Sequence, residues 1–145
     1  MLDVFPLTLG PLNNIVYLLS DQKTKKSAIV DPAWSFKDIQ KVIHEHQLNI
    51  TMVLLTHCHF DHINALGDVI KEYDVPIYLS QAYKGHFIKH ASNLRFTVHK
   101  QRLWIGDSLV YVLHTPGHSK GCQSFYQEPL LLTGDCLFID RVGRS

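Results

Sequence analysis

The chain has 145 residues, of which 46% are hydrophobic and 19% charged, and its formal net charge is +1 with histidine neutral. This length predicts a single domain, residues 1–145, with a sizeable core, and the near-zero charge argues against a nucleic acid or an anionic membrane as partner. No apolar run approaches the roughly 18 residues of a membrane span, and the N-terminus does not resemble a signal peptide. Three cysteines without zinc-finger spacing favour a reduced, cytoplasmic protein, so the ten histidines are the one compositional anomaly.

The first half of the chain alternates predicted strands and helices. Apolar runs bounded by turn residues predict strands, and apolar residues at a spacing of three and four predict helices. Ser35, with Asp38 three residues later, resembles a helix-capping box. The predicted elements are strands at Leu2–Leu9, Ile15–Leu19 and Ser27–Val30, a helix at Phe36–Gln47, a strand at Ile50–Leu55, a helix over Leu66–Tyr73 and a strand at Val75–Leu79.

The second half predicts mainly strands. Tyr83, Phe87 and Ile88 suggest a short helix, and an extended piece follows at Phe96–Val98. Further strands are predicted at Leu109–Leu113, Cys122–Tyr126 and Leu130–Thr133. Elements that alternate early and then run together as strands indicate a layered α/β domain with a mixed sheet, not a helical bundle.

One short turn concentrates metal-binding side chains. Residues 56–62 read THCHFDH and come directly after the apolar run 52–55. His57 and His59 are two apart, so in an extended backbone they point the same way and can share one ion. Asp61 and His62 are adjacent and diverge, but both can face a second point a few ångströms away. The spacing predicts two neighbouring metal sites, of the kind about 3.5–4 Å apart that cleaves esters and amides, with ligands that suit zinc, iron or manganese.

Two later turns carry further candidate ligands. His118 lies in TPGHS and Asp135 in TGD, and in each turn a glycine lets the backbone bend sharply after an apolar strand. The two oxygens of Asp135 could bridge two ions. His114 ends the strand before His118 and is a candidate hydrogen-bond partner of a ligand. Cys58 lies between two ligands and by alternation should point away from the metal.

These motifs together resemble those of the metallo-β-lactamase superfamily of metal-dependent hydrolases. THCHFDH, TPGHS and TGD occur in this order after AIVDP, and the resemblance covers the chain from Phe5 to Ser145. It implies an αββα sandwich with mixed sheets, one or two zinc ions or iron in their place, and a role for Asp31 beside the metal centre. The implied metal ligands are His57, His59 and His118 for the first ion, Asp61 and His62 for the second, and Asp135 between the two.

The stretch GDCLFIDRVGRS resembles the glyoxalase II and persulfide dioxygenase branch of that superfamily. This resemblance implies a hydrolase in which a metal-activated water attacks the carbonyl of a thioester or ester. Asp61 or Asp135 would accept the proton of that water, and Arg144 would contact the substrate. The implied substrate is a small molecule such as a glutathione-type thiol conjugate, and a homodimer is an assembly that the sequence leaves open.

Two alternative functions remain open at this point. A mononuclear iron dioxygenase acting on a persulfide would use His57, His118 and Asp135 as a facial triad. The family's domain continues beyond the GR stretch with a further second-site histidine, so we expect this domain, as printed, to be truncated at its C-terminal end. In that case the chain would be a metal-holding fragment without turnover, with an exposed sheet edge.

Overall fold

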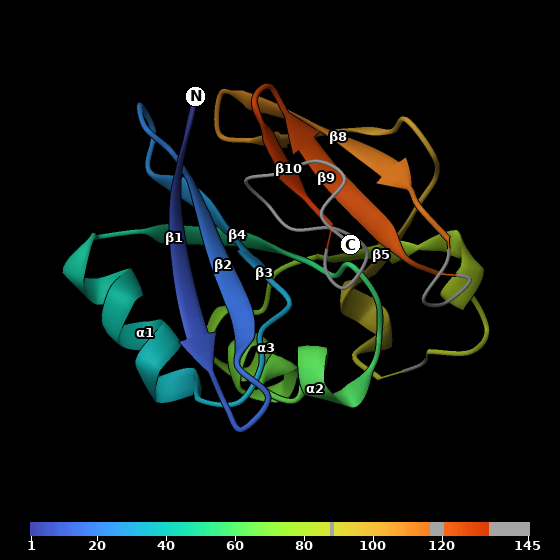
Figure 1. Ribbon diagram of the computed structural model, residues 1–145, viewed down its shortest axis with the longest axis horizontal. Helices are drawn as coiled ribbons and strands as arrows, with labels where there is room; N and C mark the ends of the chain where they lie inside the picture. The colour runs from blue at the N-terminus through green and yellow to red at the C-terminus, as the bar shows by residue number, and fades with distance from the viewer. Residues whose placement is uncertain (88, 117–120, 134–145) are drawn as a thin grey trace.

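The computed structural model describes residues 1–87, 89–116 and 121–133. Within these residues two β-sheets lie face to face, and helices cover only one side of the pair (Figure 1). The elements are β1 Leu2–Leu9, β2 Asn14–Asp21, β3 Lys26–Val30, α1 Phe36–Glu45, β4 Asn49–Leu54, α2 Phe60–Ile63, α3 Leu66–Tyr73, β5 Ile77–Ser80, 3₁₀ turns Gln81–Tyr83 and Ala91–Asn93, β6 Leu94–Thr97, β7 Arg102–Ile105, β8 Ser108–His114, β9 Gln123–Gln127 and β10 Leu130–Leu132.

The larger sheet is mixed, as the sequence predicted. Its strand order is β1-β2-β3-β4-β5-β6. The β1–β2 and β2–β3 pairs are antiparallel, whereas β3–β4, β4–β5 and β5–β6 are parallel. The smaller sheet, β10-β9-β8-β7, is antiparallel within the described residues. The parallel strands bring their carboxyl ends to one edge, which is where open α/β sheets place their sites.

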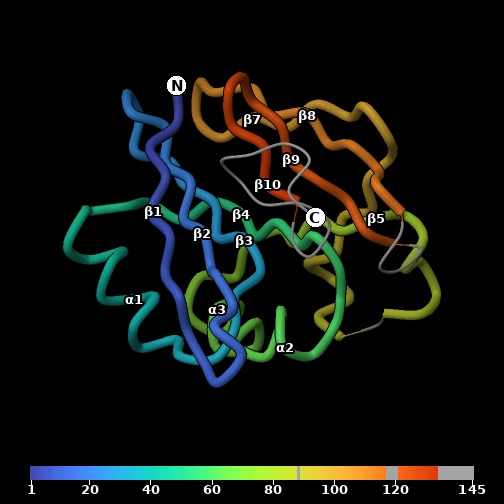
Figure 2. Tube along the Cα trace, in the orientation of Figure 1, coloured from blue at the N-terminus to red at the C-terminus, as the bar shows by residue number. Residues whose placement is uncertain are grey.

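The helices α1 and α3 confirm the predictions made from apolar spacing. The Ser35 hydroxyl accepts a hydrogen bond from the main chain of Asp38 over 3.3 Å and caps α1. This helix ends two residues before the predicted Gln47, because Gln47 adopts a left-handed φ of 55°. Figure 2 follows the chain from β4 through α2 to α3, along the side of the larger sheet that α1 also covers.

Two apolar cores follow from the alternation of side chains along the central strands. In β3, Ile29 faces α1 and α3, whereas Ala28 and Val30 face the smaller sheet. In β4, Val53 faces the helices and Leu54 the smaller sheet. The prediction of a strand buried on both faces after residue 49 is therefore confirmed, and β4 is fixed from both sides just before the histidine-rich turn.

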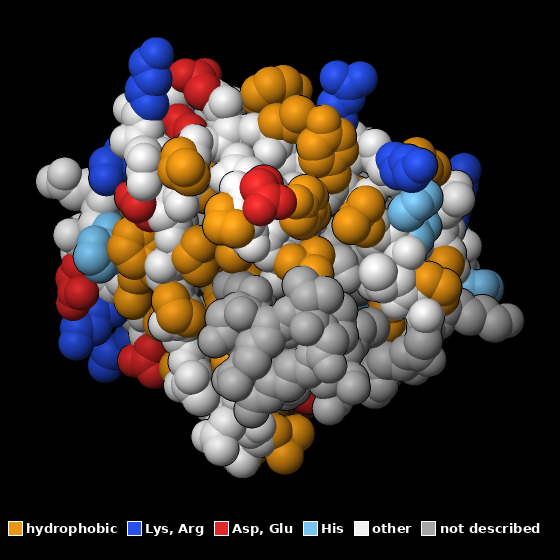
Figure 3. Space-filling view, turned by 45° about the horizontal axis from the view of Figure 1, so that its top comes forward, with side chains coloured by type: hydrophobic (Ala, Val, Ile, Leu, Met, Phe, Trp, Pro, Cys, Tyr) orange, Lys and Arg blue, Asp and Glu red, His pale blue; other side chains and the backbone are white. Residues whose placement is uncertain are grey.

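The outer face of the smaller sheet carries exposed apolar side chains. Trp104 is 57% exposed and Tyr111 38% exposed, while their neighbours Leu103 and Val110 point into the core between the sheets. Figure 3 tilts the top of Figure 1 towards the viewer, and hydrophobic side chains lie there among charged ones. Of the predicted αββα sandwich, the described residues supply the first three layers. No helix among them is long and apolar enough to cross a membrane.

The structure corrects the prediction around residue 85. The short helix expected from Tyr83 and Phe87 is instead a 3₁₀ turn at Gln81–Tyr83. It ends because Lys84 is extended, with a φ of −60° and a ψ of 127°, and Gly85 then turns the chain with a φ of +81° that favours glycine. Three short elements were also not predicted: the four-residue strand β7, the four-residue helix α2 and the 3₁₀ turn Ala91–Asn93.

Candidate metal centre

The site forms where the parallel strands β3 and β4 end side by side. Asp31 is the first residue after β3, and its main-chain N–H donates to the carbonyl of Leu54 over 3.0 Å, at the end of β4. Three residues beyond Leu54 the chain reaches His57, and the short helix α2 then brings His62 back towards Asp31. The register of two neighbouring strands therefore places side chains from two separate segments at one point.

Asp31 is the centre of the hydrogen bonds at this site. Its side chain is buried, with an exposed fraction of 4% for the residue. One oxygen accepts the main-chain N–H of Thr56 over 2.8 Å, and the other accepts the Thr56 hydroxyl over 2.5 Å. The second oxygen also lies 3.1 Å from Nδ1 of His62. Because Asp31 adopts a φ of 51°, it occupies the left-handed region that aspartate tolerates better than most residues.

These contacts indicate through which nitrogen each histidine could bind a metal ion. A carboxylate only accepts, so His62 carries its proton on Nδ1. The single hydroxyl hydrogen of Thr56 is donated to Asp31, so Thr56 accepts from Nδ1 of His57, 3.0 Å away. In a neutral imidazole with its proton on Nδ1, Nε2 is the nitrogen that can bind a metal ion. Metal-binding histidines are commonly oriented in this way, through the nitrogen that does not bind the ion.

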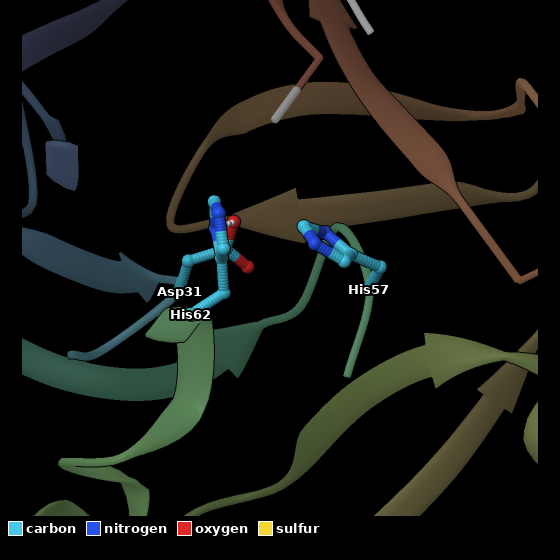
Figure 4. A group of neighbouring side chains, drawn as sticks. All are labelled: Asp31, His57 and His62. Carbon is cyan, nitrogen blue, oxygen red and sulfur yellow. Dashed lines mark hydrogen bonds and ion pairs between the residues drawn. The ribbon is translucent and has the colours of Figure 1, made fainter. Parts of the chain in front are cut away.

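The ligand atoms of these residues lie close together. One atom each from Asp31, His57 and His62 lies within 4.8 Å of the other two, and all three residues are buried. The ring centroids of His57 and His62 are 4.3 Å apart. Figure 4 shows the two imidazoles approaching each other, with Asp31 beside His62.

His59 and Asp61 complete the turn on its more exposed side. The His59 ring lies 4.6 Å from that of His57, edge to face. That these two residues share one ion stays a prediction. Oδ2 of Asp61 lies 3.8 Å from Nε2 of His62, so both could bind one ion at the usual 2.0–2.2 Å. Burial acts to raise the pKa of Asp61, but a hydrogen bond from Asn14 and the neighbouring His62 outweigh it and hold that pKa below the ordinary value.

The donor set fits a borderline metal ion. Imidazole nitrogens and carboxylate oxygens suit zinc or iron rather than a metal that prefers sulfur. The nearby thiol of Cys58 packs against the core between helices and sheet, as alternation predicted. Burial, with the charge of Asp31 as a second cause, raises the pKa of Cys58 to about 12, so this thiol stays protonated at neutral pH.

The remaining predicted residues have different outcomes. His118, Asp135 and Arg144 lie outside the described residues. The main-chain N–H of His114 donates to Nδ1 of His99 over 3.0 Å, and no hydrogen bond to a predicted ligand is seen within the described part of the chain. Desolvation, followed by the charge of His99, lowers the pKa of His114. Its predicted contact with a ligand therefore stays a prediction.

The sequence did not identify three residues that shape this site. Thr56 carries the hydrogen bond between Asp31 and His57, and Asn14 reaches Asp61 from the start of β2. Gln123 joins the smaller sheet to the turn: its main-chain N–H donates to the carbonyl of Thr56 and its amide to that of Leu55, each over 2.8 Å. Of the three, only Thr56 could have been suspected from the sequence, because it adjoins His57 in THCHFDH.

Similar proteins place this geometry in a family. The chain is 30% identical to the probable polyketide biosynthesis zinc-dependent hydrolase BaeB of Bacillus velezensis over 90% of this chain and 58% of that protein. It is 33% identical to the cytoplasmic hydroxyacylglutathione hydrolase of Arabidopsis thaliana over 91% of this chain and 52% of that protein. The chain thus spans between half and three fifths of the length of these two relatives.

Solved structures give the same result for the fold. The crystal structure of ETHE1 from Myxococcus xanthus matches with a TM-score of 0.81 and 26% identity over 94% of this chain and 58% of that one. The di-iron-bound form of TTHA1623 matches with a TM-score of 0.76 and 31% identity over 97% of this chain and 76% of that one. The family model of the metallo-beta-lactamase superfamily matches residues 9–145. The chain belongs to the metallo-β-lactamase superfamily, whose mixed α/β fold and histidine-rich turn it carries.

Proposed function

We propose that this chain is a hydrolase that cleaves a thioester or ester with a metal-activated water. The observation that carries the proposal is the hydrogen-bond chain from Asp31 through Thr56 to His57 and directly to His62. It holds two buried imidazoles, each through Nδ1, with ring centroids 4.3 Å apart. Histidines that bind a catalytic ion are commonly oriented in this way. A histidine pair that served only the core would not need both rings fixed in the same tautomer.

Each of the predicted ligands has a role in this proposal. A bound zinc or iron ion would lower the pKa of a water molecule towards neutrality and polarise the substrate carbonyl. The ligands would be His57, His59 and His118 at one position, Asp61 and His62 at the other, and Asp135 between them. Asp61 or Asp135 would accept the proton of the water. The partly exposed carboxylate of Asp61, with its lowered pKa, is ionised and available to accept it at neutral pH.

The relatives support a small-molecule thioester as substrate. The Arabidopsis protein is named for the hydrolysis of hydroxyacylglutathione, and the Bacillus protein for a zinc-dependent hydrolase of polyketide biosynthesis. We propose a glutathione-type or related thiol conjugate for this chain, with Arg144 as a contact to the thiol carrier. The proposal concerns this chain, which spans 52% to 58% of those two proteins.

The test is metal reconstitution followed by two assays. The metal-free chain is loaded with zinc or with ferrous iron, and release of free thiol from a lactoyl-glutathione-type thioester is measured. Oxygen consumption with glutathione persulfide is measured in parallel, because the iron dioxygenase alternative predicts that reaction. Thiol release that depends on the added metal supports the proposal. Oxygen consumption without thiol release, or no turnover with either substrate, contradicts it.

A pair of histidine variants controls for loss of fold. His59 is exposed, so His59→Ala should remove a ligand without leaving a cavity in the core, and thiol release should fall sharply. His44, in the last turn of α1, is also exposed. The matched variant His44→Ala should keep the parent's activity. Equal activity in the two variants would contradict the ligand role of the turn.

A further inference from the structure

Asn14 joins the metal-binding turn to a part of the chain that the sequence did not connect with it. It begins β2, at the end of the β1–β2 turn that reaches down beside α2 (Figures 1 and 2). Its Nδ2 donates to Oδ2 of Asp61 over 3.1 Å and lies 3.4 Å from Nε2 of His62. One amide group thus faces both side chains that we assign to the second ion.

Trp34 determines which way this amide points. Its indole Nε1 donates to Oδ1 of Asn14 over 2.9 Å. With its oxygen engaged by the indole, the amide must turn its NH₂ group to the opposite side. That side is where Asp61 lies. A reversed amide would set its NH₂ against the indole N–H and its oxygen against the carboxylate, so two donors and then two acceptors would oppose each other.

Trp34 is itself held from two directions. A Cβ atom at Gly10, in the β1–β2 turn, would lie 2.4 Å from Cδ1 of the indole, so the ring packs directly on the backbone there. The main-chain N–H of Trp34 donates to Oδ1 of Asn64, just after α2, over 2.6 Å. Its ring also meets that of Phe60 edge to face, with centroids 6.2 Å apart. The indole is therefore fixed between the β1–β2 turn and α2.

We propose that Asn14 is a positioning residue, held by Trp34, that fixes the Asp61 carboxylate beside Nε2 of His62 and thereby strengthens metal binding by this pair. This inference rests on the proposed function, because it concerns the same metal centre. The side chain of Asp61 is 31% exposed, so without a donor it would sample several rotamers and would lose conformational freedom on binding the ion. A neutral amide suits this role because it orients the carboxylate and leaves its negative charge intact. A lysine or arginine would compete with the cation.

Metal affinity is the measurement that tests the proposal. Apo protein is titrated with zinc in competition with a chromophoric chelator, and the chelator concentration that withdraws half of the bound metal is compared between variants. Asn14→Ala should lower the affinity for the ion that we assign to Asp61 and His62 by about tenfold, the lower end of the range for residues that orient metal ligands. Trp34→Phe keeps an aromatic ring but removes the indole N–H, and should give a smaller loss in the same direction.

A double-mutant cycle separates positioning from a general loss of structure. In an Asp61→Ala background, Asn14→Ala should no longer lower metal affinity, because the carboxylate that it orients is gone. The exposed Asn49, at the start of β4, supplies the matched control: Asn49→Ala should bind metal as the parent does. Thermal unfolding of each apo variant shows whether the fold is kept.

Two results would overturn the proposal: parent-like affinity in Asn14→Ala, or an undiminished effect of Asn14→Ala in the Asp61→Ala background. Failure of the proposed function is a different result, since it would appear as absent thioester cleavage with the affinity differences intact.

Discussion

Replacing Asp31 by asparagine tests the hydrogen-bond chain that orients both histidines. The substitution keeps the shape of the side chain but turns one acceptor oxygen into a donor NH₂. If the amide oxygen keeps the N–H of Thr56, the NH₂ then faces the Thr56 hydroxyl and Nδ1 of His62, which both donate to Asp31 in the parent. His62 can relieve this conflict only by moving its proton to Nε2, and that removes the lone pair a metal ion needs.

The expected magnitudes follow from the number of bonds affected. A hydrogen bond to a charged acceptor contributes about 1.5–3 kcal/mol, against about 0.5–1.5 kcal/mol for a neutral one. Two hydrogen bonds converge on the oxygen that is lost, and each changes from a charged to a neutral partner at a cost of about 1–1.5 kcal/mol. The free energy of unfolding of the apo Asp31→Asn variant should therefore fall by about 2–3 kcal/mol. Metal affinity should fall by about 10–100-fold, as for other residues that hold a histidine ligand. At 1.4 kcal/mol per tenfold this is about 1.4–2.8 kcal/mol of binding free energy.

Three measurements check this prediction on one set of proteins. Urea unfolding of the apo forms gives the stability difference, and chelator competition gives the metal affinity. Long-range ¹H–¹⁵N correlation spectra of the histidine rings report the tautomers: His57 and His62 should both be protonated on Nδ1 in the apo parent. Asp107→Asn is the matched control, because the Asp107 side chain is 62% exposed and its contact with Lys23 is 4.0 Å long. Parent-like tautomers together with parent-like metal affinity in Asp31→Asn would refute the reasoning.

Three further predictions follow from other parts of the structure. Hydrogen bonds, that of the Ser108 hydroxyl first among them, hold the pKa of Asp21 well below its ordinary value, so the carboxylate stabilises the fold above its unfolded pKa of about 3.9. In urea unfolding, Asp21→Asn should therefore be less stable than the parent at pH 7, and the difference in free energy of unfolding should shrink as the pH falls from about 4 towards 2. A difference that does not change with pH would contradict this. Because burial and then Asp31 raise the pKa of Cys58 to about 12, its peptide should stay unalkylated by iodoacetamide at pH 8 in native protein and react after unfolding, as peptide mass mapping would show. Asp135→Ala should abolish thiol release while leaving the far-ultraviolet circular dichroism spectrum unchanged, and parent-like turnover would show that TGD is not part of the centre.

The part of the fold that could be predicted is the part that long periodic segments specify. The helices α1 and α3 bury Ile39, Ile43 and Val69 on one face, and β4 is apolar along its buried length, so local pattern and tertiary packing agree there. β7 and α2 were missed because four residues are too few to show a period. The turn at Gln81–Tyr83 was misread because the extended Lys84 and the positive φ of Gly85 end the helical conformation despite the apolar spacing around them.

The sequence by itself determined that four candidate metal ligands, His57, His59, Asp61 and His62, follow directly after a buried strand. That was possible because these candidate ligands are close together along the chain, and their spacing alone restricts how they can point. The roles of the partners could not be read in this way. Thr56 and Asp31 are 25 residues apart, and Asn14 and Asp61 are 47 apart. Only the pairing of β3 with β4 and the packing of the β1–β2 turn against α2 decide that these side chains meet, since hydrogen bonds depend on distances of tenths of an ångström that no local pattern encodes.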